Sequence, residues 1–131
     1  MEQKDKELLL KDLCARLPYG VMVYDNSHGS YGESKLINIG IDGSMLIDNE
    51  NNDIQYYPII SEVKPYLRPL ESMTEEEKKE YDKLLFWKSQ IKVFESDLKV
   101  FDWLNSHHFD YRGLIEKGLA LEAPEGMYKK F

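Results

Sequence analysis

The sequence predicts an α+β fold: a small antiparallel sheet of three to five strands, with an N-terminal helix and two or three C-terminal helices. Two observations lead to this class. Leucines at helical spacing open the chain, and apolar residues alternate at the strand period through its middle. These alternating stretches follow one another too closely for helical crossovers, which favours antiparallel pairing. The 131 residues are expected to form a single domain, 1–131.

The first helix is expected over residues 4–17, where Leu9 and Leu13 belong to a leucine stripe at helical spacing. Pro18 ends this helix, because proline disfavours helical geometry in the residue before it. Cys14, the only cysteine of the chain, lies in the same stretch. No internal disulfide can form, and Cys14 is expected to be a small buried apolar residue.

The sheet is expected to contain a central hairpin at Asp42-Gly43. Apolar residues alternate on both sides of this dipeptide, in residues 35–41 and 44–48. Glycine supplies the positive φ that a tight turn needs, so Asp-Gly between two such runs indicates a two-residue turn. A further strand is expected in residues 54–60, where Pro58 either interrupts the strand or sets it at a sheet edge.

The second half of the chain predicts a connector followed by helices. Residues 63–73 contain two prolines and predict an extended connector that leads out of the sheet. Thr74 then starts a helix, and Glu77, three residues later, matches a capping box. Another helix is expected from about Ser96 to His107. Its buried side is assigned to four apolar residues: Phe94, Leu98, Phe101 and Leu104.

The net charge and the lack of long apolar segments limit the kinds of partner that the sequence predicts. The formal net charge of −7 repels phosphate, so no nucleic-acid binding through a basic face is expected. An acidic protein can imitate nucleic acid, although solubility is the simpler reason for such a surface. The sequence shows neither a signal peptide nor an apolar run long enough to cross a bilayer. We therefore expect a cytoplasmic protein with no membrane partner.

Motifs that identify common classes of enzyme do not occur in the sequence. There is no phosphate-binding loop, dinucleotide fingerprint, CxxC, HExxH or GxSxG. A calcium loop starting at Asp48 would need glycine and glutamate where Asp53 and Ile59 stand. No cofactor is therefore expected, and a non-enzymatic protein is favoured.

The stretch "WLNSHHFDYRG", residues 103–113, is the one cluster of residue types that carry chemistry. On a helix, His107 and His108 point about a quarter-turn apart, so they cannot easily share one metal. A zinc site would need Asp110 and His28 as further ligands, and His28 lies far away in a glycine-rich loop. No metal site is therefore expected.

Two interpretations of this cluster remain open. In the structural one, the histidines cap the C-terminal end of a helix, Asp110 and Arg112 pair with each other, and Trp103 packs on the sheet or on Tyr66. In the functional one, aromatic and charged side chains line a binding groove. The candidate lining consists of Tyr66, Arg68, Trp103, His107, His108, Asp110 and Arg112.

Three stretches carry a resemblance to a known family: "LLLKDLCARLPYGV", "VKPYLRPLESMTEEEKKEYDKL" and "FDWLNSHHFDYRGLIEKGLALEAPEGMY". Together they resemble a family of short uncharacterised proteins from gut anaerobic bacteria, often found in prophage-like or mobile-element settings. The resemblance covers about half of the chain and leaves out residues 22–60. It implies a bacterial cytoplasmic origin and a phage-linked accessory role, and it implies no activity, cofactor or catalytic residue.

These observations lead to two functional hypotheses. The first is a small, acidic, non-enzymatic interaction module, phage-linked, whose partner is another protein. The alternative is an enzyme or a small-ligand binder that uses His107, His108, Asp110 and Arg112. A pocket that holds several of these four side chains would favour the alternative, whereas a filled surface would favour the interaction module.

Overall fold

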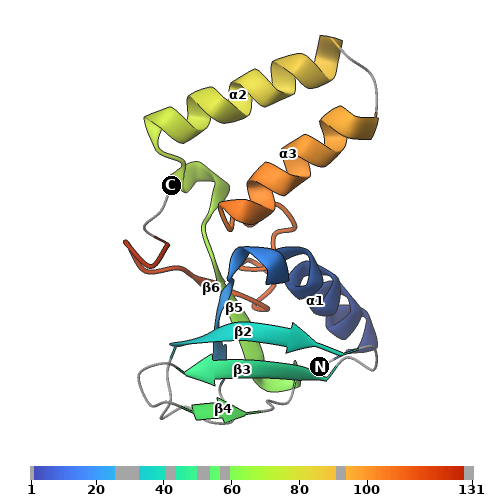
Figure 1. Ribbon diagram of the computed structural model, residues 1–131, viewed down its shortest axis with the longest axis vertical. Coiled ribbons are helices and arrows are strands. Elements are labelled where there is room, and N and C mark those ends of the chain that lie inside the picture. The colour runs from blue at the N-terminus through green and yellow to red at the C-terminus, as the bar shows by residue number, and fades with distance from the viewer. Residues whose placement is uncertain are drawn as a thin grey trace.

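The computed structural model describes residues 2–25, 33–40, 44–49, 54–56, 60–90 and 94–128, and it confirms the α+β class (Figure 1). In chain order the helices and strands are α1 (Gln3–Arg16), β1 (Met22–Asp25), β2 (Glu33–Ile39), β3 (Met45–Asn49), β4 (Ile54–Tyr56), β5 (Val63–Leu67), α2 (Glu75–Gln90), α3 (Phe94–Ser106) and β6 (Leu121–Glu122). Short 3-10 turns are η1 (Leu17–Tyr19), η3 (Ile60–Glu62) and η4 (Leu70–Ser72).

The strands form a sheet in the order β4-β3-β2-β1-β5-β6. The first five strands pair in antiparallel fashion, as predicted, and β4 lies at an edge. The sheet is nevertheless mixed, because the two-residue β6 returns after α2 and α3 and pairs parallel to β5. Strands β2 and β3 form the predicted central hairpin, in which the Gly40 N–H donates a hydrogen bond to the Ser44 carbonyl. The expected turn residues Asp42-Gly43 lie outside the described residues.

The prediction of an extended connector in residues 63–73 is wrong for its first half, because Val63–Leu67 is strand β5. This strand pairs with β1 on one side and with β6 on the other. The Ala123 N–H donates to the Leu67 carbonyl, so the odd-numbered residues of β5 direct their backbone groups towards β6. The nitrogen of Pro65 therefore faces the β6 side of the strand, at a position before β6 begins. The proline removes no hydrogen bond between β5 and β1.

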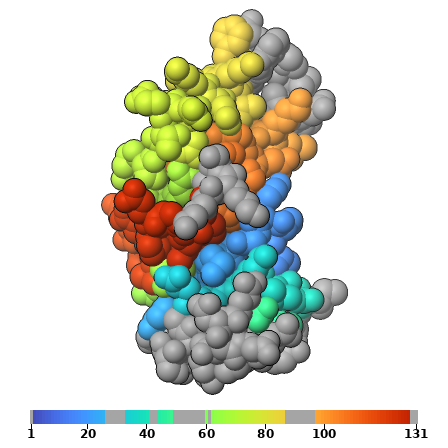
Figure 2. All heavy atoms as spheres, turned by 60° about the vertical axis from the view of Figure 1, so that its left-hand side comes forward, coloured from blue at the N-terminus to red at the C-terminus, as the bar shows by residue number. Residues whose placement is uncertain are grey.

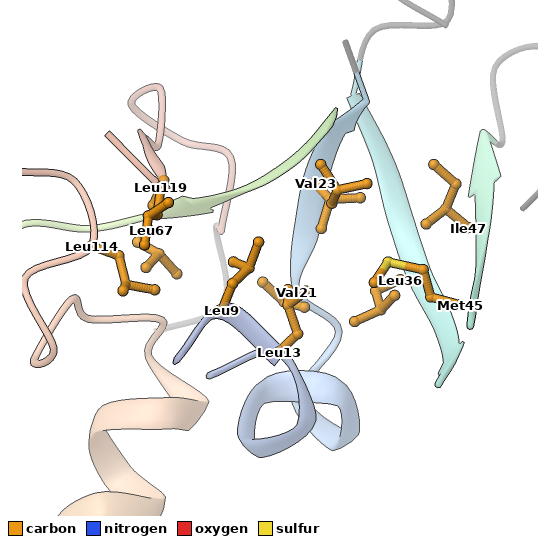
Figure 3. Packing of buried hydrophobic residues seen from close by; sticks show 12 residues of the cluster. Leu9, Leu13, Val21, Val23, Leu36, Met45, Ile47, Leu67, Leu114 and Leu119 are labelled. Carbon is orange, nitrogen blue, oxygen red and sulfur yellow. The ribbon is translucent and has the colours of Figure 1, made fainter. Parts of the chain in front are cut away.

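The main core lies between α1 and the sheet. Figure 3 shows Leu9 and Leu13 of α1 directed towards Val21 and Val23 near the start of the sheet. The buried members of this core are Leu9, Leu13, Val21, Val23, Leu36, Met45, Ile47, Val63, Leu67, Leu114, Leu119 and Ala120. Cys14 is exposed, contrary to expectation, because the buried face of α1 is formed by positions 9, 12, 13 and 16.

Helices α2 and α3 lie side by side beyond the sheet and share a second, smaller core (Figure 1). Val100, Leu104 and Phe109 are its buried members. The predicted buried side of α3 is confirmed for Leu104 but wrong for Leu98, which is 61% exposed, and for Phe101, which is 46% exposed. The helix is rotated so that the side with Val100 and Leu104 meets the small core with α2.

This rotation gives the first testable prediction. Leu104→Ala should lower the free energy of unfolding by about 2–5 kcal/mol, because it removes buried methyl groups and leaves a cavity. Leu98→Ala is the matched control on the same helix and should change this free energy by less than about 0.5 kcal/mol. Urea denaturation measures both values. Equal destabilisation by the two variants would contradict the observed rotation of α3.

Candidate functional site

The cluster 103–113 crosses the carboxyl end of β5. The Arg68 N–H donates to the His108 carbonyl at 2.8 Å, and the Asp110 N–H donates to the Arg68 carbonyl at 2.9 Å. These bonds form an isolated parallel bridge between Arg68 and Phe109. The end of α3 is thereby attached to the sheet through the backbone of the cluster itself.

The side chain of Arg68 joins the same place to the start of α2. Its guanidinium donates two hydrogen bonds to Glu77, at 2.7 and 2.6 Å, and lies 4.2 Å from the centre of the Phe109 ring. Glu77 also accepts from the Thr74 N–H at 2.9 Å, while its own N–H donates to the Thr74 hydroxyl at 3.1 Å. The predicted capping box is therefore confirmed. Burial alone would raise the pKa of Glu77, but the hydrogen bonds from Arg68 and Thr74 lower it below its ordinary value.

Trp103 and His107 form a stack at the end of α3. Their ring centres are 4.2 Å apart, and the His107 Nδ1 lies 2.9 Å from the Trp103 carbonyl oxygen. The expected capping of the helix end by a histidine is thus observed. Trp103 packs on Tyr81 of α2 and donates its indole N–H to Glu80 at 2.9 Å. The prediction that Trp103 packs on the sheet or on Tyr66 is wrong, because α2 covers this side of α3.

His108 is buried and points away from His107. Its backbone φ is +60°, a left-handed conformation, and its ring stacks on Tyr128 with centres 3.8 Å apart. The Tyr128 hydroxyl accepts a hydrogen bond from the Met22 N–H and donates one to the Tyr66 carbonyl, both at 2.8 Å. The structural interpretation, in which both histidines cap the helix end, is therefore wrong for His108. Burial, followed by the charges of Arg16 and other nearby cations, lowers the pKa of His108 to about 3, so its ring is neutral.

Asp110 and Arg112 do not pair with each other, contrary to the structural prediction. The Asp110 carboxylate accepts hydrogen bonds from the Leu114 N–H at 2.8 Å and the Ile115 N–H at 3.0 Å. The Arg112 Nε instead lies 3.3 Å from a carboxylate oxygen of Asp12. Asp110 therefore closes its own turn, and Arg112 connects this turn to α1.

Sequence reasoning missed the most buried charged pair, Asp12 and Arg16. Both side chains are 0% exposed, and Arg16 donates to the two Asp12 oxygens at 2.8 and 3.1 Å. Arg16 also donates to the Phe109 carbonyl at 2.6 Å. A signal was present in the sequence, because these two residues are four apart and share a helix face with Leu9 and Leu13.

One of the seven candidate residues lies at a groove in the described part of the chain. A groove of about 480 Å³ lies between the start of α2 and the C-terminal segment, and among these candidates only Arg68 lines it. Tyr66, a candidate for the opposite wall, is buried, and its burial, with the charge of Glu33, raises its pKa. Among the described residues, no group of three or more histidine, cysteine or acidic side chains is placed to hold a metal ion. His28 lies outside the described residues.

Comparison of the chain with protein-family models, curated proteins and solved structures finds no match. None of the helices that the structure describes is long and apolar enough to cross a membrane. The interpretation of the cluster therefore depends on the contacts above.

The buried Asp12–Arg16 pair gives a second prediction. Arg16→Met should lower the free energy of unfolding by about 3–5 kcal/mol, because it leaves a buried carboxylate and the Phe109 carbonyl without their main donor. Arg112→Met, which removes a partly exposed guanidinium from the same carboxylate, should cost only about 1 kcal/mol. Chemical denaturation at neutral pH measures both. A loss below 1 kcal/mol for Arg16→Met would contradict the assigned role.

The neutral His108 gives a third prediction, on pH. Its pKa is about 3 in the folded protein and near its ordinary value of 6.5 in the unfolded chain. The unfolded state therefore takes up a proton first as the pH falls, so stability is complete above pH 6.5 and decreases below it. The free energy of unfolding should fall by up to about 1.4 kcal/mol per pH unit between pH 6 and 5.

The variant His108→Gln isolates this effect. Its stability should depend less on pH between 7.5 and 5 than that of the parent protein. Urea denaturation across this range gives the slopes. If the His108→Gln variant and the parent have the same slope, His108 is not the group responsible.

Proposed function

We propose that this chain is a non-enzymatic module that binds another protein through one side of the α2–α3 hairpin. The observation that carries the proposal is a group of large apolar side chains that the fold leaves in solvent. We define the hairpin face by three of these residues: Leu85 of α2 and Leu98 and Phe101 of α3. Exposed apolar side chains that gather on one side are typical of protein-interaction sites.

Helix geometry places these three residues on the same side of the hairpin. Trp103 and Glu80 are bonded across one side of the α2–α3 pair. Successive residues are rotated by about 100° around a helix axis. Leu85 on α2 and Phe101 on α3 therefore lie on the side of the hairpin opposite to the Trp103–Glu80 hydrogen bond. Leu98 is one turn from Phe101 and continues the same stripe. The hairpin face is therefore separate from the residues that hold the two helices together.

The contacts of the cluster also support an interaction module over the alternative hypothesis. An enzyme or ligand binder would use His107, His108, Asp110 and Arg112 around a shared space. In this fold His107 stacks on Trp103, His108 is buried on Tyr128, and the other two are engaged by backbone amides and by Asp12. These contacts favour a structural role for the four residues.

The partner is expected to present an apolar surface. Phenylalanine and leucine side chains contribute by losing contact with water, and a few such residues commonly carry most of the binding energy of an interface. A phage-linked role is a further part of this proposal and depends only on the family resemblance. It predicts that the partner is a protein of the bacterial cytoplasm.

The fourth prediction tests the hairpin face. The double variant Leu98→Glu, Phe101→Glu should remain folded, with a melting temperature lowered by several degrees at most, because Leu98 is 61% and Phe101 46% exposed and only the ring contact of Phe101 with Tyr111 is lost. It should lose at least about tenfold in affinity for the partner, since glutamate cannot be buried unpaired in an apolar interface. The measurement is quantitative capture from a lysate of the encoding organism, followed by direct titration with the purified partner.

The matched control is Lys83→Gln, Lys99→Gln. It changes the net charge by the same two units at exposed positions on the other flanks of the two helices. This control should bind the partner as the parent protein does. Recovery of the same partner in the same amount by both double variants would contradict the proposed face.

A further inference from the structure

The hairpin face continues beyond α3 through a row of side-chain contacts. Leu98 and Phe101 are one helical turn apart, and Asn105 is the next turn of the same stripe. The Phe101 ring packs on the Tyr111 ring, with centres 5.3 Å apart, and the Tyr111 hydroxyl donates to the Asn105 side chain at 2.8 Å. The row therefore runs from Leu98 along α3 to the segment that follows this helix.

The end of this row borders the first helix. In Figure 2 the orange of α3 lies directly above the blue of α1. The guanidinium carbon of Arg16, from α1, lies 5.3 Å from the centre of the Tyr111 ring. Tyr111 thus has contacts on both helices, and its position is fixed before any partner arrives. A site formed in advance loses less entropy on association.

Arg112 adds a positive charge beside Tyr111. Its guanidinium carbon lies 5.2 Å from the centre of the Tyr111 ring. Its Nε is buried and lies 3.3 Å from an Asp12 oxygen, without forming a hydrogen bond. Both oxygens of Asp12 already accept hydrogen bonds from Arg16. Arg112 is therefore the second cation on one carboxylate, and the more weakly held of the two.

The outer part of the Arg112 guanidinium can receive a further carboxylate. The side chain is 29% exposed, and its two terminal nitrogens are neither enclosed nor hydrogen-bonded to any residue that the structure describes. A guanidinium presents its donors in a planar fork that matches the two oxygens of a carboxylate. Next to the apolar row, this fork makes the surface complementary to a partner that combines apolar and acidic side chains.

We propose that the partner of the hairpin face is an amphipathic helix that carries an acidic side chain beside its apolar stripe. This inference rests on the proposed function, because it names the chemistry of what binds the same face. Apolar side chains of the helix, one turn apart, cover Leu98 and Phe101, and an aspartate or glutamate side chain binds Arg112. The row follows one side of α3, which suits a helix whose side chains repeat every three or four residues.

The probe is a stapled, fluorescein-labelled helix of about 15 residues, built from alanine and glutamine. It carries two leucines one turn apart and a glutamate one turn beyond them, and two counterparts have glutamine or lysine in place of the glutamate. Each peptide is titrated against the full chain and followed by fluorescence anisotropy. The glutamate peptide should bind at least about fivefold more tightly than the glutamine peptide, because its carboxylate adds charge-assisted hydrogen bonds to Arg112.

The net charge of the chain makes this preference diagnostic. At −7, the chain as a whole repels the glutamate peptide and attracts the lysine peptide. Tighter binding of the glutamate peptide therefore requires a local cation. Tighter binding of the lysine peptide would indicate general attraction to an acidic protein and would overturn the proposal.

Variants assign the preference to one side chain. Arg112→Gln should abolish it, so that the glutamate and glutamine peptides bind with equal affinity. Arg112→Lys should reduce it, because an ammonium group lacks the planar fork. The matched control Lys117→Gln removes an exposed cation five positions later and should keep the full preference. Amide NMR shifts caused by the glutamate peptide should include residues 98–101 and 111–112.

The experiment separates this inference from the proposed function. Leu98→Glu, Phe101→Glu should weaken binding of the glutamate and glutamine peptides at least about tenfold. If it does so but the parent binds these two peptides equally, the hairpin face stands and the acidic partner is rejected.

Two further outcomes would overturn the inference. If no peptide binds at millimolar concentration, or if the NMR shifts lie away from these residues, the helix is rejected and the capture experiment alone decides on the hairpin face. If the parent chain elutes as a dimer that Leu98→Glu, Phe101→Glu converts to a monomer, the face belongs to a second copy of the chain.

Discussion

The attachment of the helices to the sheet depends on Phe109. One arginine contacts the backbone carbonyl of this residue, and a second arginine contacts its ring. Arg16 of α1 donates to its carbonyl, and the guanidinium of Arg68, at the end of β5, lies over its ring. The backbone of Phe109 meanwhile bridges to Arg68 directly after α3. One residue therefore connects the first helix, the sheet and the helical hairpin, which are far apart in the sequence.

Arg16 and Arg68 both contact Phe109 from buried or half-buried positions, so their positive charges would repel each other without compensation. Asp12 neutralises Arg16, and Glu77 neutralises Arg68, each through two hydrogen bonds. His108 lies beside both cations and completes the balance by staying neutral, as its low pKa indicates. Each carboxylate is thus required by the arginine it binds, since removal of one partner leaves an uncompensated charge in a dry environment.

The predictions from sequence succeeded where the signal is local. Thr74 and Glu77 are three residues apart and determine the start of α2 between them. The order of helices and strands, apart from β5 and β6, likewise follows from the period of apolar residues. The orientation of α3 was missed because the sequence alone gives two overlapping apolar stripes, one with Leu98 and Phe101 and one with Val100 and Leu104.

The sequence singled out residues 103–113, but most of the partners predicted for their side chains were wrong. The partner of Arg112 is 100 positions earlier in the chain, at Asp12, and the partner of His108 is Tyr128. No periodicity reports such pairings, because they depend on how separate elements pack. Strand β5 was missed for a related reason. A proline is tolerated in a strand when its nitrogen faces a position that no neighbouring strand occupies, and this depends on where β6 begins.

The same contacts explain why functional surfaces are expected at the periphery. A histidine that is stacked, buried and neutral, and a carboxylate that accepts two backbone amides, are constrained by the fold and have little freedom for chemistry. The outer part of the Arg112 guanidinium is not used in this way and lies at the surface beside Tyr111. The exposed apolar side chains include Leu85, Leu98 and Phe101 of the hairpin face. The central cluster holds this surface in place, because α3 and Tyr111 are both attached through it to the sheet.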